Sequence, residues 1–291
     1  MSSADDQDTG KFRKNTKDQY YTKSSVAQNC IHKIYECVDQ PETYQWIEPS
    51  AGNGAFLHAL PAAIDKIGID IEPKSPDIIQ ADFLIWIPER NPDNHISKRR
   101  IFFGNPPFGR QSSLAKSFIK HACKYADVIG FILPRSFVKP SMSRVFPLQF
   151  HCLYSEELEK KAFEVNGVEY DVPCIFQIWQ KKDTDRVIMD PVKEEGFRYV
   201  KNDQPFDVAF KRVGGLAGKC YPNSPNYNPN YHYFLKLDAQ YVPYIKNIID
   251  AVNLHVFPSN TVGPRSLSKS EANEVLNVVL VTVITSLHSS S

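Results

Sequence analysis

The sequence predicts an α/β fold: a mostly parallel sheet with an antiparallel edge hairpin, followed by a small β-rich C-terminal appendage. Short apolar runs alternate with amphipathic stretches up to about residue 130, as in parallel sheets whose strands are joined by helices. Two later apolar runs, over 150–156 and 173–180, indicate the antiparallel edge, and Asn166-Gly167 between them is a favoured hairpin turn. After Lys182 the composition shifts to glycine, tyrosine and Asn-Pro turns, which predicts the appendage.

Length and charge limit the classes of protein that this chain can belong to. Its 291 residues can bury one large core, or one core and a small appendage. The formal net charge of +1 excludes a global basic field, so any nucleic-acid binding must use a local patch. The six cysteines form no Cys-x-x-Cys pair and the histidines are scattered, which predicts free thiols, an intracellular protein (cytoplasmic or nuclear) and no metal.

Composition also divides the chain into segments. We expect a disordered tail over 1–18, an α/β domain over 19–182, a β-rich segment over 183–262 and a C-terminal tail over 263–291. The polar start does not resemble a signal peptide. The apolar stretch 275–287 is too short to span a bilayer, so no membrane partner is predicted.

The first helix is predicted from Ser24 or Ser25, either of which is a plausible N-cap, to about residue 38. The pair Tyr21-Thr22 directly precedes it. Backbone N–H groups at a helix N-terminus can hold a carboxylate, so this pair is a candidate for carboxylate binding. A plain surface turn is the alternative.

The first strand, over 44–48, breaks into Pro49-Ser50-Ala51-Gly52-Asn53-Gly54, and a helix opens at Ala55. Glycine permits unusual φ values and close approach of the backbone to a ligand, so this unit predicts a nucleotide-type cradle. It matches neither the dinucleotide fingerprint nor a P-loop, and phosphate is therefore not the expected ligand. The carboxylate of Glu48, immediately before the loop, can meet the ammonium of an amino-acid-bearing cofactor.

Acidic residues end the second and third predicted strands. Asp70 closes the second strand, where an acid is the recurrent partner of ribose hydroxyls, and Ile71 beside it can form an apolar wall for an adenine. Asp82 and Phe83 close the third strand. Asp82 can accept a hydrogen bond from the adenine amine of a cofactor, and Phe83 can pack nearby. Capping of loops by these acids is the alternative.

The fourth strand ends abruptly in Asn105-Pro106-Pro107-Phe108. The two prolines fix φ and donate no hydrogen bonds, and Pro106 keeps Asn105 extended. This places an amide, a free carbonyl and an aromatic face at the carboxyl edge of a strand, where α/β sheets bind ligands. Such a cluster can accept two hydrogen bonds from an exocyclic amine while a ring stacks against it. A simple Pro-Pro turn is the alternative.

The order of these features resembles the S-adenosylmethionine-dependent amino-methyltransferases, most closely the N6-adenine group of phage and bacterial type. The resemblance covers roughly residues 19–182, and the stretches 210–219 and 261–269 also resemble the downstream part of such proteins. It implies a Rossmann-like methyltransferase sheet over 19–182, a target-recognition role for 183–262, and S-adenosylmethionine as the cofactor.

The resemblance also implies a role for each motif. Tyr21 and Thr22 would meet the methionine carboxylate of the cofactor, and Glu48 with the loop Pro49 to Gly54 would hold its amino end. Further cofactor contacts would come from Asp70 to the ribose, and from Ile71, Asp82 and Phe83 to the adenine.

On the substrate side, Asn105 and the carbonyl of Pro106 would accept the two hydrogens of the target amine. Pro107 would keep the turn rigid, and Phe108 would stack on the target base. Phe163 matches the second stacking aromatic, with core packing as the alternative. Arg110 and Arg135, with other basic residues at 98–100, 139 and 144, would contact nucleic acid.

The implied function is transfer of a methyl group from S-adenosylmethionine to adenine N6 in nucleic acid, DNA rather than RNA, by direct in-line displacement. Several alternatives stay open. They are methylation of cytosine N4, of adenine in RNA or of a protein glutamine amide, and a role as an inactive cofactor-binding partner subunit. A partner subunit of unknown identity also stays open.

Overall fold

A computed structural model of the chain describes residues 20–89, 98–165, 167–188, 190–258 and 264–288. The chain forms two compact units, residues 1–187 and 188–291, which are considered separately below. The tail predicted over 1–18 lies outside the described residues. The observed boundary falls slightly beyond the one expected after residue 182.

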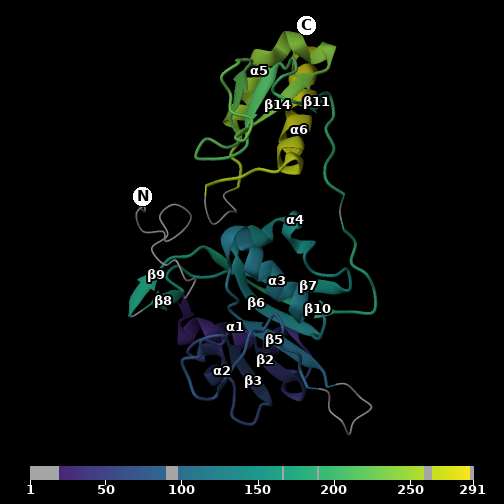
Figure 1. Ribbon diagram of the computed structural model, residues 1–291. Helices are drawn as coiled ribbons and strands as arrows, with labels where there is room; N and C mark the ends of the chain where they lie inside the picture. The colour runs from purple at the N-terminus through teal and green to yellow at the C-terminus, as the bar shows by residue number, and fades with distance from the viewer. Residues whose placement is uncertain (1–19, 90–97, 166, 189, 259–263, 289–291) are drawn as a thin grey trace. The chain divides into compact units, whose positions relative to one another are not determined.

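Unit 1 is built on a seven-stranded sheet in the order β4-β3-β2-β5-β6-β10-β7 (Figure 1). The four pairings from β4 to β6 run parallel, whereas β10 runs antiparallel to both β6 and β7. The predicted mostly parallel sheet with an antiparallel edge hairpin is therefore confirmed. The strands are β2 (Gln45–Glu48), β3 (Lys66–Asp70), β4 (Ile78–Gln80), β5 (Arg100–Gly104), β6 (Val128–Pro134), β7 (Phe150–Glu157) and β10 (Cys174–Lys181).

Helices cover both faces of this sheet, which explains why its inner strand β6 is apolar and buried throughout. On one face Phe102 packs with Phe118 and Ile119 of α3 (Ser113–Ala122). On the other, Phe103 makes edge contacts with Trp46 and Phe56, and the core includes α1 (Ser24–Cys37). The remaining helices are α2 (Ala55–Ala59), α4 (Pro140–Ser143) and the 3₁₀ turns η3 (Pro41–Thr43), η4 (Arg110–Ser112) and η5 (Arg135–Val138).

A second, three-stranded antiparallel sheet joins the start of unit 1 to its end. It contains β1 (Tyr21–Thr22), β8 (Phe163–Val165) and β9 (Val168–Tyr170), and pairs Thr22 with Phe163. The N–H of Lys23 also donates to the carbonyl of Ala162 at 3.1 Å. Lys23, rather than Ser24 or Ser25, occupies the N-cap position of α1 and makes no side-chain cap, because this sheet already fixes the chain's entry into the helix.

Unit 2 contains a four-stranded antiparallel sheet in the order β11-β14-β12-β13. Its strands are β11 (Phe197–Val200), β12 (Val208–Lys211), β13 (Cys220–Pro222) and β14 (His232–Leu237). The 3₁₀ turn η6 (Ala239–Tyr244) leads from the sheet to α5 (Ile245–Leu254), and α6 (Lys269–His288) follows. Phe210 and Leu235 of the sheet share a core with Val252 of α5 and Leu276 of α6. The segment expected as a C-terminal tail thus supplies a core helix of this unit.

None of the helices in the described ranges is long and apolar enough to cross a membrane. Residues 275–287 lie within α6, where Leu276, Leu280 and Val283 are buried in the core of unit 2. Their apolar character is therefore explained by packing.

The glycine that ends β5 connects the sheet to the Asn105 turn and yields a first prediction. Gly104 has φ +118°, and a Cβ there would lie 3.0 Å from Cγ of Glu48. Gly104→Ala should lower the free energy of unfolding by about 1–3 kcal/mol and displace Glu48. Urea denaturation of the purified protein measures this loss.

The matched control is Gly167→Ala. Gly167 also has a positive φ, +76°, but a Cβ there would meet no atom within 4 Å. Gly167→Ala should therefore lower the free energy of unfolding by less than Gly104→Ala, because only backbone strain contributes to its loss. Equal losses in the two variants would contradict the close approach of Gly104 to Glu48.

Candidate active site

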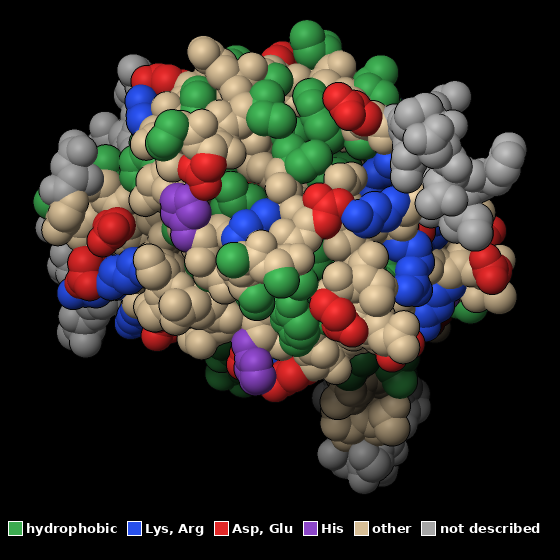
Figure 2. All heavy atoms as spheres, turned by 90° about the horizontal axis from the view of Figure 1, so that it is seen from below, with side chains coloured by type: hydrophobic (Ala, Val, Ile, Leu, Met, Phe, Trp, Pro, Cys, Tyr) green, Lys and Arg blue, Asp and Glu red, His purple; other side chains and the backbone are tan. Residues whose placement is uncertain are grey.

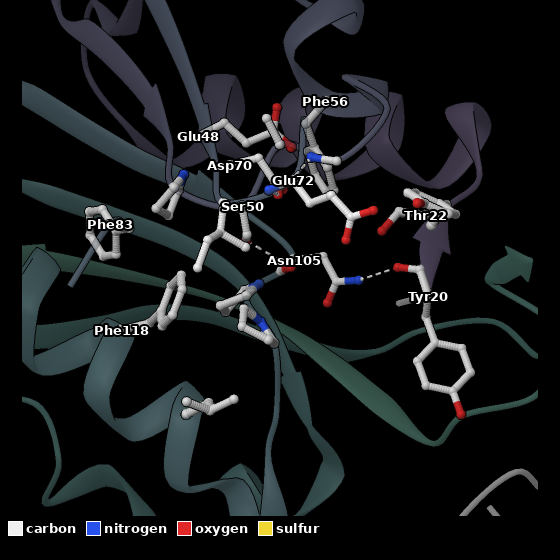
Figure 3. Close-up of a pocket in the computed structure, with 18 of the residues that line it drawn as sticks. Tyr20, Thr22, Glu48, Ser50, Phe56, Asp70, Glu72, Phe83, Asn105 and Phe118 are labelled. Carbon is white, nitrogen blue, oxygen red and sulfur yellow. Dashed lines mark hydrogen bonds between the residues drawn. The ribbon is translucent and has the colours of Figure 1, made fainter. Parts of the chain in front are cut away.

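The carboxyl ends of β2, β3 and β5 surround a cavity of about 420 Å³, within the range of small-molecule sites (Figure 3). Most of the residues that the sequence singled out line it. They are Tyr21, Thr22, Glu48, Pro49, Ser50, Ala51, Gly52, Asn53, Asp70, Ile71, Asp82, Phe83, Asn105, Pro106, Pro107, Phe108 and Phe163. The adjacent carboxyl ends of parallel strands bring these separate segments together.

The glycine loop after β2 approaches its neighbours closely. Gly52 has φ +53°, and a Cβ there would lie 3.1 Å from the ring of Tyr21. Gly54 has φ +83° and does not line the cavity; a Cβ there would lie 2.5 Å from the ring of His58. Both positions therefore require glycine, Gly52 beside the cavity and Gly54 beneath the first turn of α2.

Asp70 ties this loop to the end of β3. Its Oδ2 accepts the N–H of Gly52 and its Oδ1 accepts the N–H of Glu72, both at 2.8 Å. A carboxylate has about four acceptor sites, so Asp70 holds the backbone and keeps sites for ligand hydroxyls. Glu72, which the sequence prediction missed, also lines the cavity.

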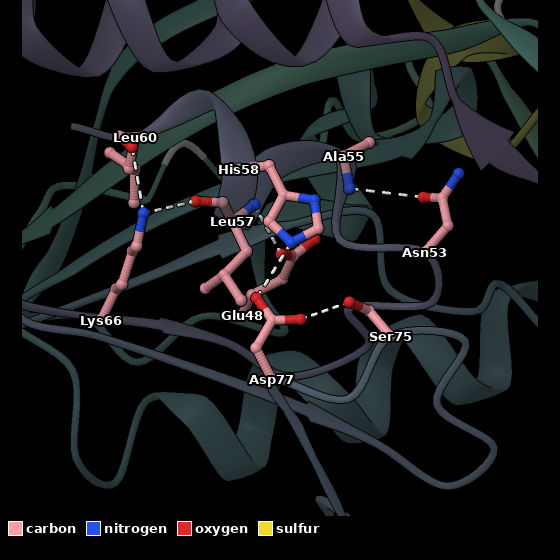
Figure 4. A network of polar contacts seen from close by, with 9 residues as sticks. All are labelled: Glu48, Asn53, Ala55, Leu57, His58, Leu60, Lys66, Ser75 and Asp77. Carbon is pink, nitrogen blue, oxygen red and sulfur yellow. Dashed lines mark hydrogen bonds and ion pairs between the residues drawn. The ribbon is translucent and has the colours of Figure 1, made fainter. Parts of the chain in front are cut away.

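Glu48 lines the cavity with a buried carboxyl group that is 2% exposed, and Figure 4 shows this group beside Leu57. The N–H of Leu57 donates to its Oε2 at 3.0 Å. Burial nevertheless raises the pKa of Glu48 well above its usual value, and the nearby Asp70 adds to the increase. A cation entering the cavity would favour the ionised form of Glu48, so this end of the site is suited to an ammonium group.

The side-chain amide of Asn105 is fixed in one orientation. Its Nδ2 donates to the carbonyl of Tyr20 at 3.2 Å, while Ser50 Oγ donates to the backbone carbonyl of Asn105 at 3.0 Å (Figure 3). Because the nitrogen end is used, the Oδ1 end remains an acceptor. This Oδ1 is buried and has no hydrogen-bond partner among the described residues. A buried polar atom without a partner is costly, which points to a donor supplied by a ligand.

Thr22 provides a second buried atom of this kind. Its side chain is 5% exposed and lines the cavity from β1, and its Oγ1 has no partner in the described part of the chain. A hydroxyl can donate or accept, so Thr22 can bind a ligand carboxylate. The two unpaired atoms belong to segments far apart in the sequence, at β1 and at the end of β5.

The aromatic residues around the cavity differ in exposure. Phe108 is half-buried and packs partly against the core cluster of unit 1. Phe163 is only 1% exposed, and the ring of Tyr20 contacts it edge-on with centroids 6.3 Å apart. Tyr20 also lies 5.7 Å from the ring of Tyr170. Phe163 therefore serves at least as packing for Tyr20, and its predicted stacking on a base stays a prediction.

Two predicted substrate residues do not line the cavity. Arg135 in η5 donates from its Nε to Glu157 at 2.9 Å, and Arg110 is exposed in η4. Sequence reasoning missed other lining residues: Tyr20, Ala55, Phe56, Glu72, Ala81, Leu84, Leu114, Phe118 and Val172. The helical spacing of Leu114 and Phe118, and the acid two residues after Asp70, were signals that could have found some of them. Among the described residues, no cluster of His, Cys, Asp and Glu could hold a metal ion.

The buried carboxyl group yields a prediction on stability. A carboxyl group whose folded-state pKa lies above its unfolded value stabilises the fold below the unfolded pKa, near 4.5, and loses that contribution as the pH rises through the folded pKa. Glu48→Gln, which cannot ionise, should therefore gain thermal stability relative to the wild type between about pH 5 and about pH 8. The exposed Glu42→Gln is the control. Melting curves across this range measure the difference, and a constant difference would argue against the raised pKa.

No family model and no curated protein matches the chain. Among solved structures, a type I restriction-modification methyltransferase subunit from Streptococcus thermophilus aligns with a TM-score of 0.42 and 14% identity, over 89% of this chain and 57% of that one. The M protein of the type I restriction enzyme EcoKI aligns at 0.37 and 15%, over 59% and 46%.

A provisionally assigned RNA methyltransferase from Pyrococcus horikoshii aligns with a TM-score of 0.40 and 17% identity, over 58% of this chain and 90% of that one. The fold assignment rests on the strand order observed in this chain itself, a seven-stranded α/β sheet with one antiparallel strand near its edge.

Proposed function

We propose that this chain is an S-adenosylmethionine-dependent methyltransferase that methylates the N6 amine of adenine in nucleic acid, DNA in preference to RNA. The observation that carries the proposal is the buried Oδ1 of Asn105. It lies at the carboxyl end of β5 without a partner, beside a glycine-lined cavity. It is an acceptor of fixed orientation, which is the group that an exocyclic amine requires.

The residues around the cavity fit the parts of S-adenosylmethionine. Glu48 lines the cavity and has a raised pKa, as expected of a carboxyl group that pairs with the ammonium of a ligand. The unpaired Oγ1 of Thr22 suits a carboxylate. Asp70 and Glu72 can accept ribose hydroxyls. Ile71, 70% exposed at the cavity wall, offers an apolar surface for the adenine ring.

S-adenosylmethionine, when bound, supplies an electrophilic methyl group on a positively charged sulfur. The residues of the chain act on the target amine, whose lone pair is delocalised into the base. Asn105 Oδ1 and the carbonyl of Pro106 would accept its two hydrogens out of the ring plane and so favour a more tetrahedral nitrogen with a localised lone pair. Phe108 would hold the base by stacking. The bonds from Tyr20 and Ser50 fix Asn105 beforehand, so little reorganisation is needed.

Nucleoside mass spectrometry tests this function. The protein and S-adenosylmethionine are incubated with DNA, RNA and protein pools, and each pool is hydrolysed and analysed. N6-methyladenine in DNA is the expected product. Methylation confined to cytosine or to protein would overturn the assignment to adenine N6, and absence of any methylated product would leave the chain as a cofactor-binding partner.

The catalytic assignment of Asn105 has its own test. Asn105→Ala should lower the rate of methyl transfer by about a hundredfold or more, because a preorganised polar contact in the transition state is lost. Binding of S-adenosylmethionine, measured by calorimetry, should change little. Asn29→Ala, an exposed position on α1, is the matched control and should keep full activity. An active Asn105→Ala enzyme would show that the amide does not act on the amine.

Glu48 gives the affinity for the cofactor a pH dependence. Because its pKa is raised in the empty protein, binding an ammonium requires Glu48 to lose its proton, and affinity should rise with pH until that pKa is passed. Glu48→Gln should abolish this dependence and weaken binding by about 2 kcal/mol or more, at least about thirtyfold. Calorimetric titration from about pH 5 to about pH 8 measures both effects. Unchanged pH dependence in the variant would place the ammonium elsewhere.

A further inference from the structure

Several basic residues of unit 1 pair with carboxylates of the same unit. Arg135 pairs with Glu157, Lys98 pairs with Asp65, and Lys161 lies 3.2 Å from Glu169. The face in Figure 2 accordingly shows Lys and Arg side chains interspersed with Asp and Glu. A nucleic-acid backbone needs cations that internal carboxylates do not neutralise.

Unit 2 contains a long stretch without acidic residues. No Asp or Glu occurs from 208 to 237, whereas Lys211, Arg212, Lys219 and Lys236 do. Lys236 pairs with Asp207 at 2.8 Å, and Lys219 donates to a backbone carbonyl. Lys211 and Arg212, at the end of β12, are therefore the cations of this stretch that remain for an external partner.

The turn after β12 pairs with a segment from much later in the chain. The N–H of Gly214 donates to the carbonyl of Arg265, and the N–H of Leu267 donates to the carbonyl of Arg212, both at 2.9 Å. Val213 and Ser266 form an antiparallel bridge between these bonds. The pairing joins two motifs that the sequence singled out. It also brings Arg265 to the turn, where its Nη1 donates to the carbonyl of Ala217 at 3.5 Å and its other guanidinium nitrogens have no partner among the described residues. Residues 211–219 with 264–267 are called the basic turn below.

Arg212 has an unfilled donor. Its Nε is buried and has no partner in the ranges that the structure describes, while its guanidinium lies 4.9 Å from the ring centroid of Tyr233. The nearby acid Glu271 is used by the start of α6, where it accepts from the N–H and the hydroxyl of Ser268 at 2.8 and 2.7 Å. A guanidinium held on an aromatic ring with an open donor suits a phosphate oxygen, whose geometry matches its fork.

The glycines of the basic turn leave its surface open. Gly214 has φ +106° and needs glycine for its conformation, but Gly215 has no positive φ. A Cβ at either position would meet no atom of the chain within 4 Å. The fold therefore gives no reason for glycine at 215, whereas close approach of a ligand to the backbone would. Beside the turn, Lys211 lies over the ring of Tyr231, which is 49% exposed.

We propose that the basic turn of unit 2 binds the phosphodiester backbone of the nucleic-acid substrate, with Arg212, Arg265 and the open backbone at Gly215 as its contacts. The proposal rests on the proposed function in taking nucleic acid as the substrate. It assigns backbone binding to the basic turn of unit 2.

Fluorescence anisotropy of the full-length chain with a labelled DNA duplex, and with one of its single strands, tests this site over a range of salt. Arg212→Gln and Arg265→Gln should each weaken binding about fivefold at about 0.15 M salt and lower the slope of log affinity against log salt by about one. Arg212→Lys, which keeps the charge, should keep the slope. Gly215→Val should weaken binding without lowering the melting temperature.

The matched control is Lys246→Gln. It removes the same charge from unit 2, on α5, where Lys246 pairs with Asp250 at 2.6 Å. Near-normal binding by this control supports the basic turn, and losses equal to those of the arginine variants would overturn it. If Arg212→Gln lowers the melting temperature, Arg265→Gln and Gly215→Val decide the matter.

The two proposals fail in different ways. If DNA or RNA is methylated but the basic-turn variants bind it as tightly as the wild type, the backbone site is wrong and the methyltransferase function stands. If these variants lose binding while no nucleic acid is methylated, the backbone site stands and the function is wrong.

Discussion

The structure of the cavity depends on how one amide is held. Asn105 follows a buried strand, precedes two prolines that cannot donate, and is fixed through the carbonyl of Tyr20 and the hydroxyl of Ser50. These bonds use its amide nitrogen and its backbone oxygen, while its Oδ1 has no partner among the described residues. The loop after β2, the end of β5 and the segment before β1 therefore meet at Asn105, and a shift in any of them would turn its Oδ1.

The second constraint is electrostatic. The interior of unit 1 contains a carboxyl group that burial disfavours in its ionised form, and this group lines the cavity at the carboxyl ends of β2, β3 and β5. Strongly perturbed acids are concentrated at functional sites because the same environment that destabilises the charge strengthens its interaction with a cation. Gly104 lets the backbone pass close to this group.

Much of the site could be predicted from sequence because it is assembled by local rules. Glu48 and Asp70 each end a strand and Asn105 directly follows one, and neighbouring parallel strands place such ends together. The bond from Asn105 to Tyr20 could not be predicted, because its acceptor is a backbone carbonyl, which every residue type carries. In addition, β1 is placed only by its non-local pairing with β8. The same pairing replaced the expected serine cap of α1. Helix α6 was missed because its β-branched residues weaken the local helical signal, and burial in unit 2 overrides that preference.

The pairing of β1 with β8 has a consequence for how the protein is made. One strand of this small sheet emerges from the ribosome among the first parts of unit 1, and its partner emerges near the end of that unit. Non-local pairings of this kind form late, because the intervening chain must be ordered first. Nascent chains therefore cannot complete the cavity until nearly all of unit 1 has been synthesised, and a ligand of the cavity can stabilise only the finished unit.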